Sequence, residues 1–334
     1  MTTNMAWVLT KRPQGNVSHA DLAYRESPLP PLGEGQILVR NLLLSLDPTN
    51  RLWMSDRDQY LPPVGIGDVM RGVTIGIVEE SRSDRFKPGD HVQPADGGWQ
   101  SHVVADAKTT RRVHVDPQID LTAQMSVLGV TGLTAYFGLL DICAPKAGET
   151  IVISAAAGAV GSIVGQIAKL NGCRVIGIAG GPAKCGWLAS ELGFDGVIDY
   201  KSEDVGTALD RLCPDGVDMS FENVGGEIMD ATFNRLRKHG RMAVCGLISA
   251  YNKEGPIGGP TDFGRILMNR LTVRGFVVID YLSRTKEAVA DLTGWIKDGR
   301  IKWKDHVIDG LDQAPTALDR LFSGQHDGKL IIRI

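Results

Sequence analysis

From residue 151 onward, short apolar runs alternate with helical runs, and this alternation restricts the possible folds more than any other feature. Strands that alternate with helices form right-handed crossover units and a parallel sheet that is covered on both faces. Strands are expected at Ile151–Ser154, Arg174–Ala179, Val197–Tyr200, Val217–Glu222, Arg241–Cys245 and Thr272–Val278. Helices are expected at Ala159–Leu170, Ala183–Leu192, Glu203–Leu212, Glu227–Arg237, Phe263–Leu271 and Arg284–Lys297. Six such strands predict a complete doubly wound α/β fold.

The first 120 residues have a different character, with short strand-like runs, frequent prolines and no long periodic helix. They predict a small, partly open β-barrel. The chain is strand-like again after residue 300, as in Lys329–Ile334, so this tail is expected to return to the first domain. We therefore expect a β-rich domain from residues 1–124 and 300–334, and a Rossmann domain from 125–299. Two domains also suit 334 residues at about 150 residues per domain.

A glycine turn follows the first strand of the predicted Rossmann domain, in the segment Ala155–Gly161. The usual pattern is G-x-G-x-x-G, and Ala156 stands at its first glycine. Gly158 lets the backbone approach a pyrophosphate, and Gly161 lets the helix pack close to the sheet. The intervening Ala159 and Val160 lie where a helix N-terminus supplies N–H donors to an anion. A glycine pattern between a strand and a helix predicts a dinucleotide site, with a plain tight turn as the alternative.

The second strand of this domain indicates which dinucleotide binds. NAD sites usually place Asp or Glu about 20 residues after the turn, to bind the ribose 2′-hydroxyl. No acidic residue occurs from Cys173 through Ser190, whereas Lys184 follows the strand and Tyr200 ends the next one. These two side chains could meet on a 2′-phosphate. The sequence therefore favours NADP(H) over NAD(H), and the alternative for Lys184 is an ordinary solvated helix lysine.

Composition excludes several other classes of partner. The net charge is −3, from 36 Lys+Arg and 39 Asp+Glu, so clustered positive charge for nucleic acid or an anionic membrane is not expected. Two charge-free windows, 121–140 and 151–168, contain polar residues or glycines and are not read as membrane spans. The N-terminus lacks the apolar core of a signal peptide, and the five cysteines form no CxxC. We expect isolated reduced thiols in a cytoplasmic protein.

The sequence also lacks a recognisable set of zinc ligands. No cysteine precedes Cys143, and the histidines of the first domain form no spaced pair with Cys or Glu. A reductase without metal must stabilise developing oxygen charge by hydrogen-bond donors. That disfavours alcohol dehydrogenation and favours reduction of a carbon–carbon double bond conjugated to a carbonyl. Hydride then adds at Cβ and the charge spreads as an enolate.

Several motifs together resemble the zinc-independent branch of the medium-chain dehydrogenases/reductases. In particular they are similar to the prostaglandin reductase and leukotriene hydroxydehydrogenase group, which includes bacterial curcumin reductase-like and 2-alkenal reductase-like proteins. The resemblance implies a GroES-like first domain beside the Rossmann domain. The matching segments are Ser45–Pro48, Gly132–Leu139, Ala155–Lys169, Glu222–Gly226, Cys245–Asn252, Gly275–Val278 and Gly328-Lys329.

The resemblance also implies roles for individual residues. Gly158–Gly161 would hold the pyrophosphate, and Lys184 with Tyr200 the 2′-phosphate. Asn223 would lie beside a cofactor ribose. Phe276 and Val278 would support the nicotinamide ring and its carboxamide. The loop along the nicotinamide side would be formed by Cys245, Gly246, Ile248, Ser249 and Tyr251.

Tyr251 matches the catalytic tyrosine of this family, whose phenol could donate a hydrogen bond to the nicotinamide ribose or the substrate oxygen. A loop tyrosine that packs on its neighbours is the alternative. Three positions depart from the family pattern: Thr49, where an aromatic wall of the substrate pocket is lost, Thr131, which replaces a proline, and His326, which replaces an asparagine near the nicotinamide.

The resulting hypothesis is an NADPH-dependent reductase of enones and enals, with small-molecule substrates and no metal. A quinone reductase of the same superfamily is the alternative within enzymes. An NADP-binding relative without turnover is the alternative outside them. The resemblance further implies a homodimer, formed through the edge strand Thr272–Val278.

Overall fold

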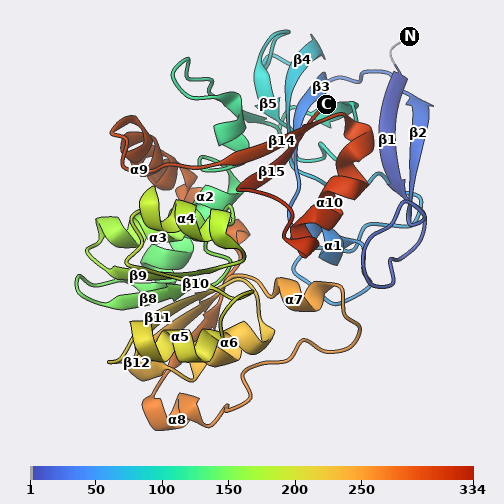
Figure 1. The fold of residues 1–334 in the computed structure, drawn as a ribbon. Helices are drawn as coiled ribbons and strands as arrows, with labels where there is room; N and C mark the ends of the chain where they lie inside the picture. Colours follow the sequence, from blue (N-terminus) through green and yellow to red (C-terminus); the bar gives the residue numbers. More distant parts are fainter. Residues whose placement is uncertain (1–2) are drawn as a thin grey trace. The chain divides into compact units, whose positions relative to one another are not determined.

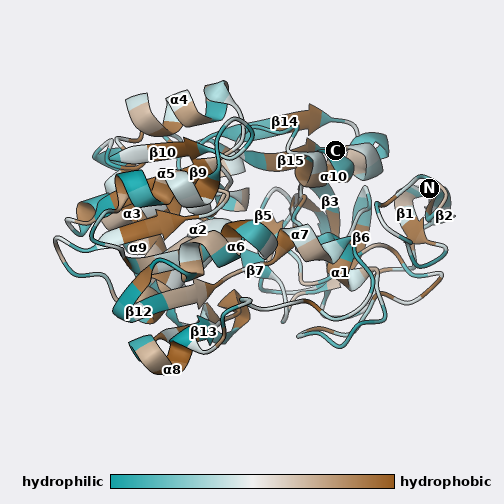
Figure 2. Ribbon diagram, turned by 60° about the horizontal axis from the view of Figure 1, so that its bottom comes forward, coloured by the Kyte–Doolittle hydropathy of each residue, from teal (hydrophilic) through white to brown (hydrophobic). Residues whose placement is uncertain are grey.

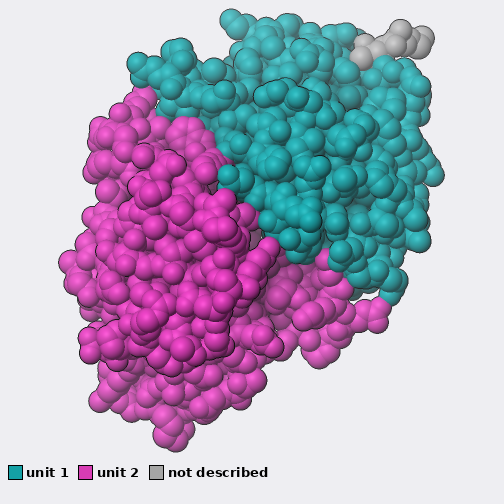
Figure 3. Space-filling view, in the orientation of Figure 1, with its two compact units in different colours: residues 1–125, 305–334 teal, residues 126–304 magenta. Residues whose placement is uncertain are grey.

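The computed structural model describes residues 3–334 (Figure 1), and within this range the chain divides into two compact units. Unit 1 contains residues 3–125 and 305–334, and unit 2 contains residues 126–304 (Figure 3). No helix among the described residues combines the length and the apolar character that a membrane crossing requires.

Unit 2 is built on a six-stranded parallel sheet with the strand order β10-β9-β8-β11-β12-β13. This is the strand order of a complete doubly wound fold, so the predicted α/β class is confirmed. The strands are β8 (Thr150–Ile153), β9 (Arg174–Ala179), β10 (Gly196–Asp199), β11 (Val217–Glu222), β12 (Leu236–Val244) and β13 (Thr272–Gly275).

Helices cover both faces of this sheet, with α3 and α4 on one face and α5 and α6 on the other (Figure 1). Their apolar sides pack on the sheet, whose central strands β8, β9 and β11 are almost entirely buried, and Figure 2 shows hydrophobic residues concentrated there. The α-helices of unit 2 are α2 (Val130–Phe137), α3 (Gly161–Leu170), α4 (Pro182–Ser190), α5 (Val205–Leu212), α6 (Gly226–Phe233), α7 (Ile248–Tyr251), α8 (Arg265–Asn269) and α9 (Thr285–Lys297). They are joined by the π-helix η2 (Gly138–Cys143) and the 3₁₀ helix η3 (Val278–Arg284).

Four expected elements of unit 2 have clearly different limits in the structure. The helix expected at Glu227–Arg237 ends at Phe233, because Arg235 already accepts a backbone hydrogen bond from Val217 of β11 at 2.9 Å. The chain thus enters β12 at Leu236 rather than at Arg241. The helix expected at Phe263–Leu271 is the shorter α8, which ends where Arg270 takes a left-handed conformation. The last strand ends at Gly275.

Unit 1 contains a seven-stranded sheet of order β14-β15-β3-β4-β5-β7, with β6 pairing β3 off this path, and a separate antiparallel pair β1-β2. β15 lies between β14 and β3, so the C-terminal segment is an interior strand of a sheet begun near the N-terminus. The strands are β1 (Thr3–Leu9), β2 (Leu22–Pro28), β3 (Gln36–Ser45), β4 (Thr74–Ser81), β5 (His91–Gln93), β6 (His102–Asp106), β7 (Arg111–Arg112), β14 (Asp305–Asp309) and β15 (Lys329–Arg333). The helices of this unit are η1 (Leu121–Met125), η4 (Leu311–Gln313), α1 (Thr49–Trp53) and α10 (Ala314–Ser323).

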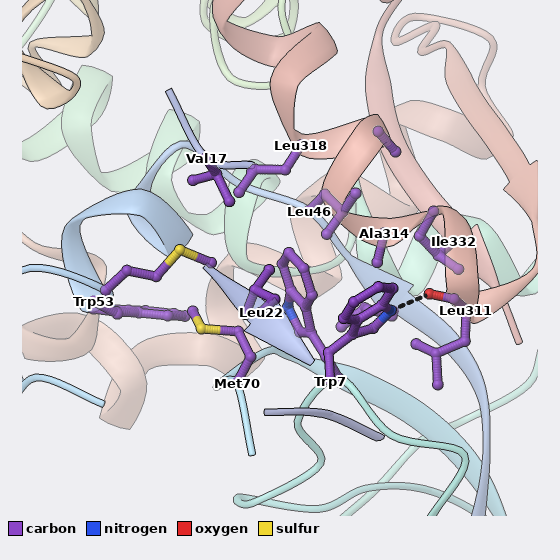
Figure 4. Close-up of a cluster of buried hydrophobic side chains, with 14 of the residues drawn as sticks. Trp7, Val17, Leu22, Leu46, Trp53, Met70, Leu311, Ala314, Leu318 and Ile332 are labelled. Atoms are coloured by element: carbon purple, nitrogen blue, oxygen red, sulfur yellow. Dashed lines mark hydrogen bonds between the residues drawn. The ribbon is translucent and has the colours of Figure 1, made fainter. Parts of the chain in front are cut away.

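The largest core of unit 1 joins the two ends of its chain. Figure 4 shows Trp7 of β1 packed among side chains that include Leu46, Leu318 of α10 and Ile332 of β15. The indole N–H of Trp7 donates a hydrogen bond of 2.8 Å to the carbonyl of Leu311. A buried indole thus satisfies its one polar atom while its ring closes the core.

Candidate functional site

Fourteen of the fifteen residues predicted to contact a dinucleotide belong to unit 2, and they follow the carboxyl ends of its six parallel strands. Parallel strands all end at one edge of their sheet, and ligands of doubly wound folds bind at that edge. The segments that leave this edge are Ala155–Val160 after β8, Gly180–Lys184 after β9, Tyr200 after β10, Asn223 after β11, Cys245–Tyr251 after β12 and Phe276–Val278 after β13.

Contacts within the backbone determine the conformation of the glycine turn after β8. Ala155 has a positive φ of 47°, and the N–H of Gly158 donates to its carbonyl at 2.9 Å. A Cβ atom on Gly161 would lie 2.5 Å from that same carbonyl, so only glycine lets α3 begin this close to the turn. A Cβ on Gly158 would meet one neighbour, the same oxygen, at 3.1 Å. The backbone at Gly158 is therefore the approachable part of the turn, as a pyrophosphate requires.

The segment after β9 is held by a carboxylate from the neighbouring strand. Asp199, the last residue of β10, accepts hydrogen bonds from the N–H groups of Gly181 at 2.9 Å and Lys201 at 3.0 Å. These two backbone bonds lower the pKa of Asp199 below its usual value. Tyr200, 44% exposed, lies over the backbone of Gly180, where a Cβ would come within 2.8 Å of the ring. The half-buried Lys184 lies in the first turn of α4. Lys184 and Tyr200 thus flank one turn.

Asn223 is fixed by both its backbone and its side chain. Its N–H donates to Ser154 Oγ at 2.8 Å, and its side-chain Nδ2 donates to the Ser154 carbonyl at 2.7 Å. Ser154 directly follows β8, so these bonds tie the end of β11 to the end of β8 across the centre of the sheet. Half-buried Asn223 therefore lies at the point where the strand order reverses, which is where such folds bind dinucleotides.

The loop after β12 carries α7 and ends with Tyr251. Its half-buried members include Cys245, Gly246, Ile248 and Ser249. The phenol oxygen of Tyr251 accepts a hydrogen bond of 3.0 Å from the N–H of Leu247. This bond uses a lone pair of the oxygen and does not consume the O–H, which is the group a general acid or hydrogen-bond donor needs. The tyrosine is therefore held in a defined position within its own loop.

Phe276 follows the edge strand and packs beneath the same end of the sheet. Its ring meets Phe221 of β11 edge-on, with ring centroids 6.1 Å apart. A Cβ on Gly138 would come within 2.3 Å of the Phe276 ring, so this glycine of the Gly132–Leu139 motif makes room for it. Val278, two residues further, begins η3 and is half-buried.

His326 is the one predicted contact residue that belongs to unit 1. It follows α10, and its ring Nδ1 lies 3.2 Å from the carbonyl of Arg320. In the same unit, buried Lys329 reaches the carbonyl of Leu46 at 2.6 Å and the carboxylate of Asp47 at 2.8 Å. This pairing links the Ser45–Pro48 motif to the C-terminal strand.

Thr49 has an aromatic neighbour in the structure, although the sequence predicts the loss of an aromatic wall at this position. The phenol of Tyr60 forms a hydrogen bond with the Thr49 hydroxyl, and burial raises the pKa of Tyr60 above its usual value. Residues 56–63 line a surface hollow of about 470 Å³. An aromatic ring from a later loop thus lies beside Thr49.

Reasoning from the sequence missed three polar groups at the carboxyl edge. Asp199 escaped because the search for an acid covered one strand, whereas the acid comes from its neighbour in the sheet. Ser154 lies one residue before the glycine turn and offered no motif of its own. Glu222 belongs to a segment that matches the family and has no predicted role of its own, yet its side chain is fully buried and accepts two backbone hydrogen bonds. An acidic residue at the end of a predicted buried strand was the available signal.

The described residues offer no suitable group of side chains to bind zinc. Residues 3–334 contain no group of three or more His, Cys, Asp or Glu side chains that could hold a metal ion. All five cysteines are free and lie in unit 2, and burial raises the pKa of Cys143 and Cys245 to about 12. Thiols with such pKa values are poor sources of thiolate ligands. We derive no step through zinc.

The fold and this edge define a dinucleotide-binding oxidoreductase of the medium-chain type. Residues 5–113 match the family model described as the N-terminal domain of oxidoreductase, and residues 159–294 match the one described as zinc-binding dehydrogenase. The chain is 40% identical to NADPH-dependent curcumin reductase of Escherichia coli K12, over 99% of this chain and 97% of that protein. It is 37% identical to prostaglandin reductase 1 of Bos taurus, over 98% of each chain.

A solved structure agrees with these relatives. The structure of CurA in complex with NADPH from Vibrio vulnificus superposes with a TM-score of 0.93, at 41% identity, and 98% of each chain is covered. The chain therefore belongs to the medium-chain dehydrogenase/reductase family, in its prostaglandin reductase and curcumin reductase group.

Proposed function

We propose that this protein reduces the carbon–carbon double bond of α,β-unsaturated ketones and aldehydes with NADPH. NADPH, when bound, supplies the hydride that adds to Cβ of the substrate. The relatives named as NADPH-dependent curcumin reductase and prostaglandin reductase support this activity, and the structure named as a complex with NADPH supports the cofactor.

The arrangement at the carboxyl edge of unit 2 is the observation that carries this proposal. The approachable backbone at Gly158 and the start of α3 suit a pyrophosphate. Lys184 and Tyr200 flank the turn at Gly180, where they would bind the 2′-phosphate through one cation and one phenol. Asn223 would hold a ribose hydroxyl, since its amide is locked by Ser154.

The chemical step needs a donor for the charge that develops on the substrate oxygen. Tyr251 would donate its O–H to that oxygen or to the nicotinamide ribose, and the enolate would be stabilised by this hydrogen bond. Phe276 and Val278 would support the nicotinamide ring, with Cys245–Ser249 along its side. A proton from solvent or from a relay completes the reaction at Cα.

A substrate panel tests the activity. The purified protein should consume NADPH with linear alkenals, cyclic enones and diarylheptanoids, and product analysis should show a saturated carbonyl compound. Turnover confined to quinones, with hydroquinone as product, would assign a quinone reductase instead. NADPH binding without oxidation across the whole panel would assign a binding protein without turnover.

We further propose a division of labour and an assembly. The Rossmann domain would hold NADP, and the GroES-like domain formed by both ends of the chain would bind the substrate. A homodimer is supported by β13, an edge strand whose four residues are all exposed. Close to it in sequence, Phe263, Leu267 and Met268 are 69, 72 and 67% exposed, and α8 is largely hydrophobic in Figure 2.

Light scattering on the wild type and on a Leu267→Asp, Met268→Asp variant tests the dimer, because the variant should be monomeric. We place the enzyme in the cytoplasm, where NADPH is supplied and free thiols stay reduced. Fractionation of the source cells checks this.

A further inference from the structure

Glu222 is a fully buried carboxyl group at the end of β11, at the edge where the dinucleotide is proposed to bind. Its Oε1 atom accepts two backbone hydrogen bonds, from Val224 at 2.6 Å and from Gly225 at 2.7 Å. Gly225 has a positive φ of 83° and precedes α6 directly. One carboxyl oxygen therefore fixes the turn that joins β11 to α6.

The loop that carries Tyr251 is held to the same turn by backbone hydrogen bonds. The backbone carbonyl of Glu222 accepts hydrogen bonds from Cys245 at 2.9 Å and from Gly246 at 3.1 Å. The next two carbonyls hold α7, since Asn223 accepts from Ile248 at 3.2 Å and Val224 accepts from Ser249 at 2.9 Å.

The loop makes a further bond of its own. Leu247, between these anchored residues, donates to the phenol of Tyr251. The position of Tyr251 thus depends on the conformation of residues 222–225.

The N-termini of α3 and α6 differ in whether their backbone N–H groups are open to a ligand. The first turn of α3 has no acidic side chain, and the backbone before it is approachable at Gly158. The N–H groups that precede α6 are instead engaged by Glu222 from within the chain. The side chain of Glu222 thus occupies donors that an external anion would need, while burial raises the pKa of its carboxyl group. The turn before α6 therefore does not offer these N–H groups to a phosphate.

We propose that Glu222 is a positioning residue for catalysis: its side chain holds the 222–225 turn, and through that turn it places Tyr251. This inference rests on the proposed function for its catalytic consequence. Its structural part concerns this chain alone.

Paired substitutions test the proposal. Glu222→Met has similar length but no acceptor, so it should release the turn and lower kcat about 100-fold, the effect of a displaced catalytic group. Glu222→Gln keeps an amide oxygen for both N–H groups and should retain most of the activity. Asp218→Leu is the matched control, because Asp218 is a buried acid at the other end of β11 that pairs with Arg237. It should lower the melting temperature and leave kcat unchanged.

Hydrogen exchange gives a readout that needs neither cofactor nor activity. In Glu222→Met the amides of residues 245–251 should exchange faster than in wild type, and in Glu222→Gln and Asp218→Leu they should exchange as in wild type. Unchanged exchange in Glu222→Met would overturn the proposal, as would a loss in Glu222→Gln as large as in Glu222→Met. If Glu222→Met fails to fold, Gly225→Ala takes its place. Its Cβ would stand 3.2 Å from Ser249 Oγ at a positive φ, and the same loop should loosen.

A double variant separates this inference from the proposed function. If Glu222 acts through Tyr251, Glu222→Met combined with Tyr251→Phe should be no slower than Tyr251→Phe alone. Losses that multiply would show that Glu222 acts by another route and would overturn the proposal. If Tyr251→Phe alone has no effect, the proposed role of Tyr251 fails. The exchange experiment then still decides whether Glu222 holds the loop.

Discussion

The ring of Tyr200 lies across the backbone of Gly180, so closely that a Cβ at residue 180 would come within 2.8 Å of it. The two residues directly follow neighbouring strands, β10 and β9, and their contact forms one wall of the turn that also carries Lys184. Gly180 belongs to no recognised motif, yet its lack of a side chain makes room for the ring of Tyr200, which is proposed to bind the 2′-phosphate.

Gly180→Ala should displace the Tyr200 ring and weaken NADPH binding, with little effect on NADH. Calorimetric titration of both cofactors measures the difference. Gly186→Ala is the control within α4, because a Cβ there meets nothing within 4 Å. Equal NADPH affinity in the two variants would show that Tyr200 does not bind the 2′-phosphate.

Lys184→Ala should raise the KM for NADPH about tenfold, since hydrogen bonds to charged groups contribute about 1.5–3 kcal/mol. Lys184→Glu should raise it further by repulsion. Neither change should alter the KM for NADH. Steady-state kinetics with both cofactors check this, and an unchanged KM for NADPH would contradict the assignment.

Tyr251→Phe should lower kcat about 100-fold, the cost of one lost hydrogen-bond donor to an oxyanion. NADPH affinity should change little, because the phenol is proposed to act on the developing charge. Single-turnover kinetics and NADPH titration separate the two effects. Tyr24→Phe, on β2 of unit 1, should leave turnover unaltered. Full activity in Tyr251→Phe would contradict the mechanism.

The Asp199 carboxylate should make the stability of unit 2 depend on pH. Backbone hydrogen bonds from Gly181 and Lys201 lower its pKa in the folded state below the unfolded value of about 3.9. Its contribution is therefore complete above the unfolded pKa and is lost as the pH falls through the folded one. The melting temperature of wild type minus that of Asp199→Ala should be constant above about pH 5 and shrink below about pH 4. A constant difference down to pH 2 would contradict this.

Lys329→Met should lower the free energy of unfolding by about 3 kcal/mol, because it leaves Asp47 and the Leu46 carbonyl without their buried cation. Arg333→Met on the same strand breaks only an exposed pair with Asp309 and should cost less than about 1 kcal/mol. Urea denaturation measures both values. Equal losses would mean that the buried pair contributes no more than the exposed one.

The order of strands and helices in unit 2 could be predicted because buried strands and amphipathic helices have distinct periods. The limits of β12 could not, since they depend on a contact between Val217 and Arg235 that is local in space and distant in sequence. The same distinction applies to the site. Gly158 and Gly161 carry a local pattern, whereas the hydrogen bond from the Gly181 N–H to Asp199 is visible only once β10 and β9 are neighbours. The hydrogen bond between Tyr60 and Thr49 likewise could not be predicted, because it forms only when the loop that carries Tyr60 is folded.

Because β15 is an interior strand of the sheet of unit 1, with Leu330, Ile331 and Ile332 fully buried, that sheet cannot be completed until residues 329–333 have been synthesised. The segment 126–304 leaves the ribosome earlier and contains all six strands of its own sheet. Unit 2 can therefore complete its sheet during translation before unit 1 does, although residues 3–125 precede it in the sequence.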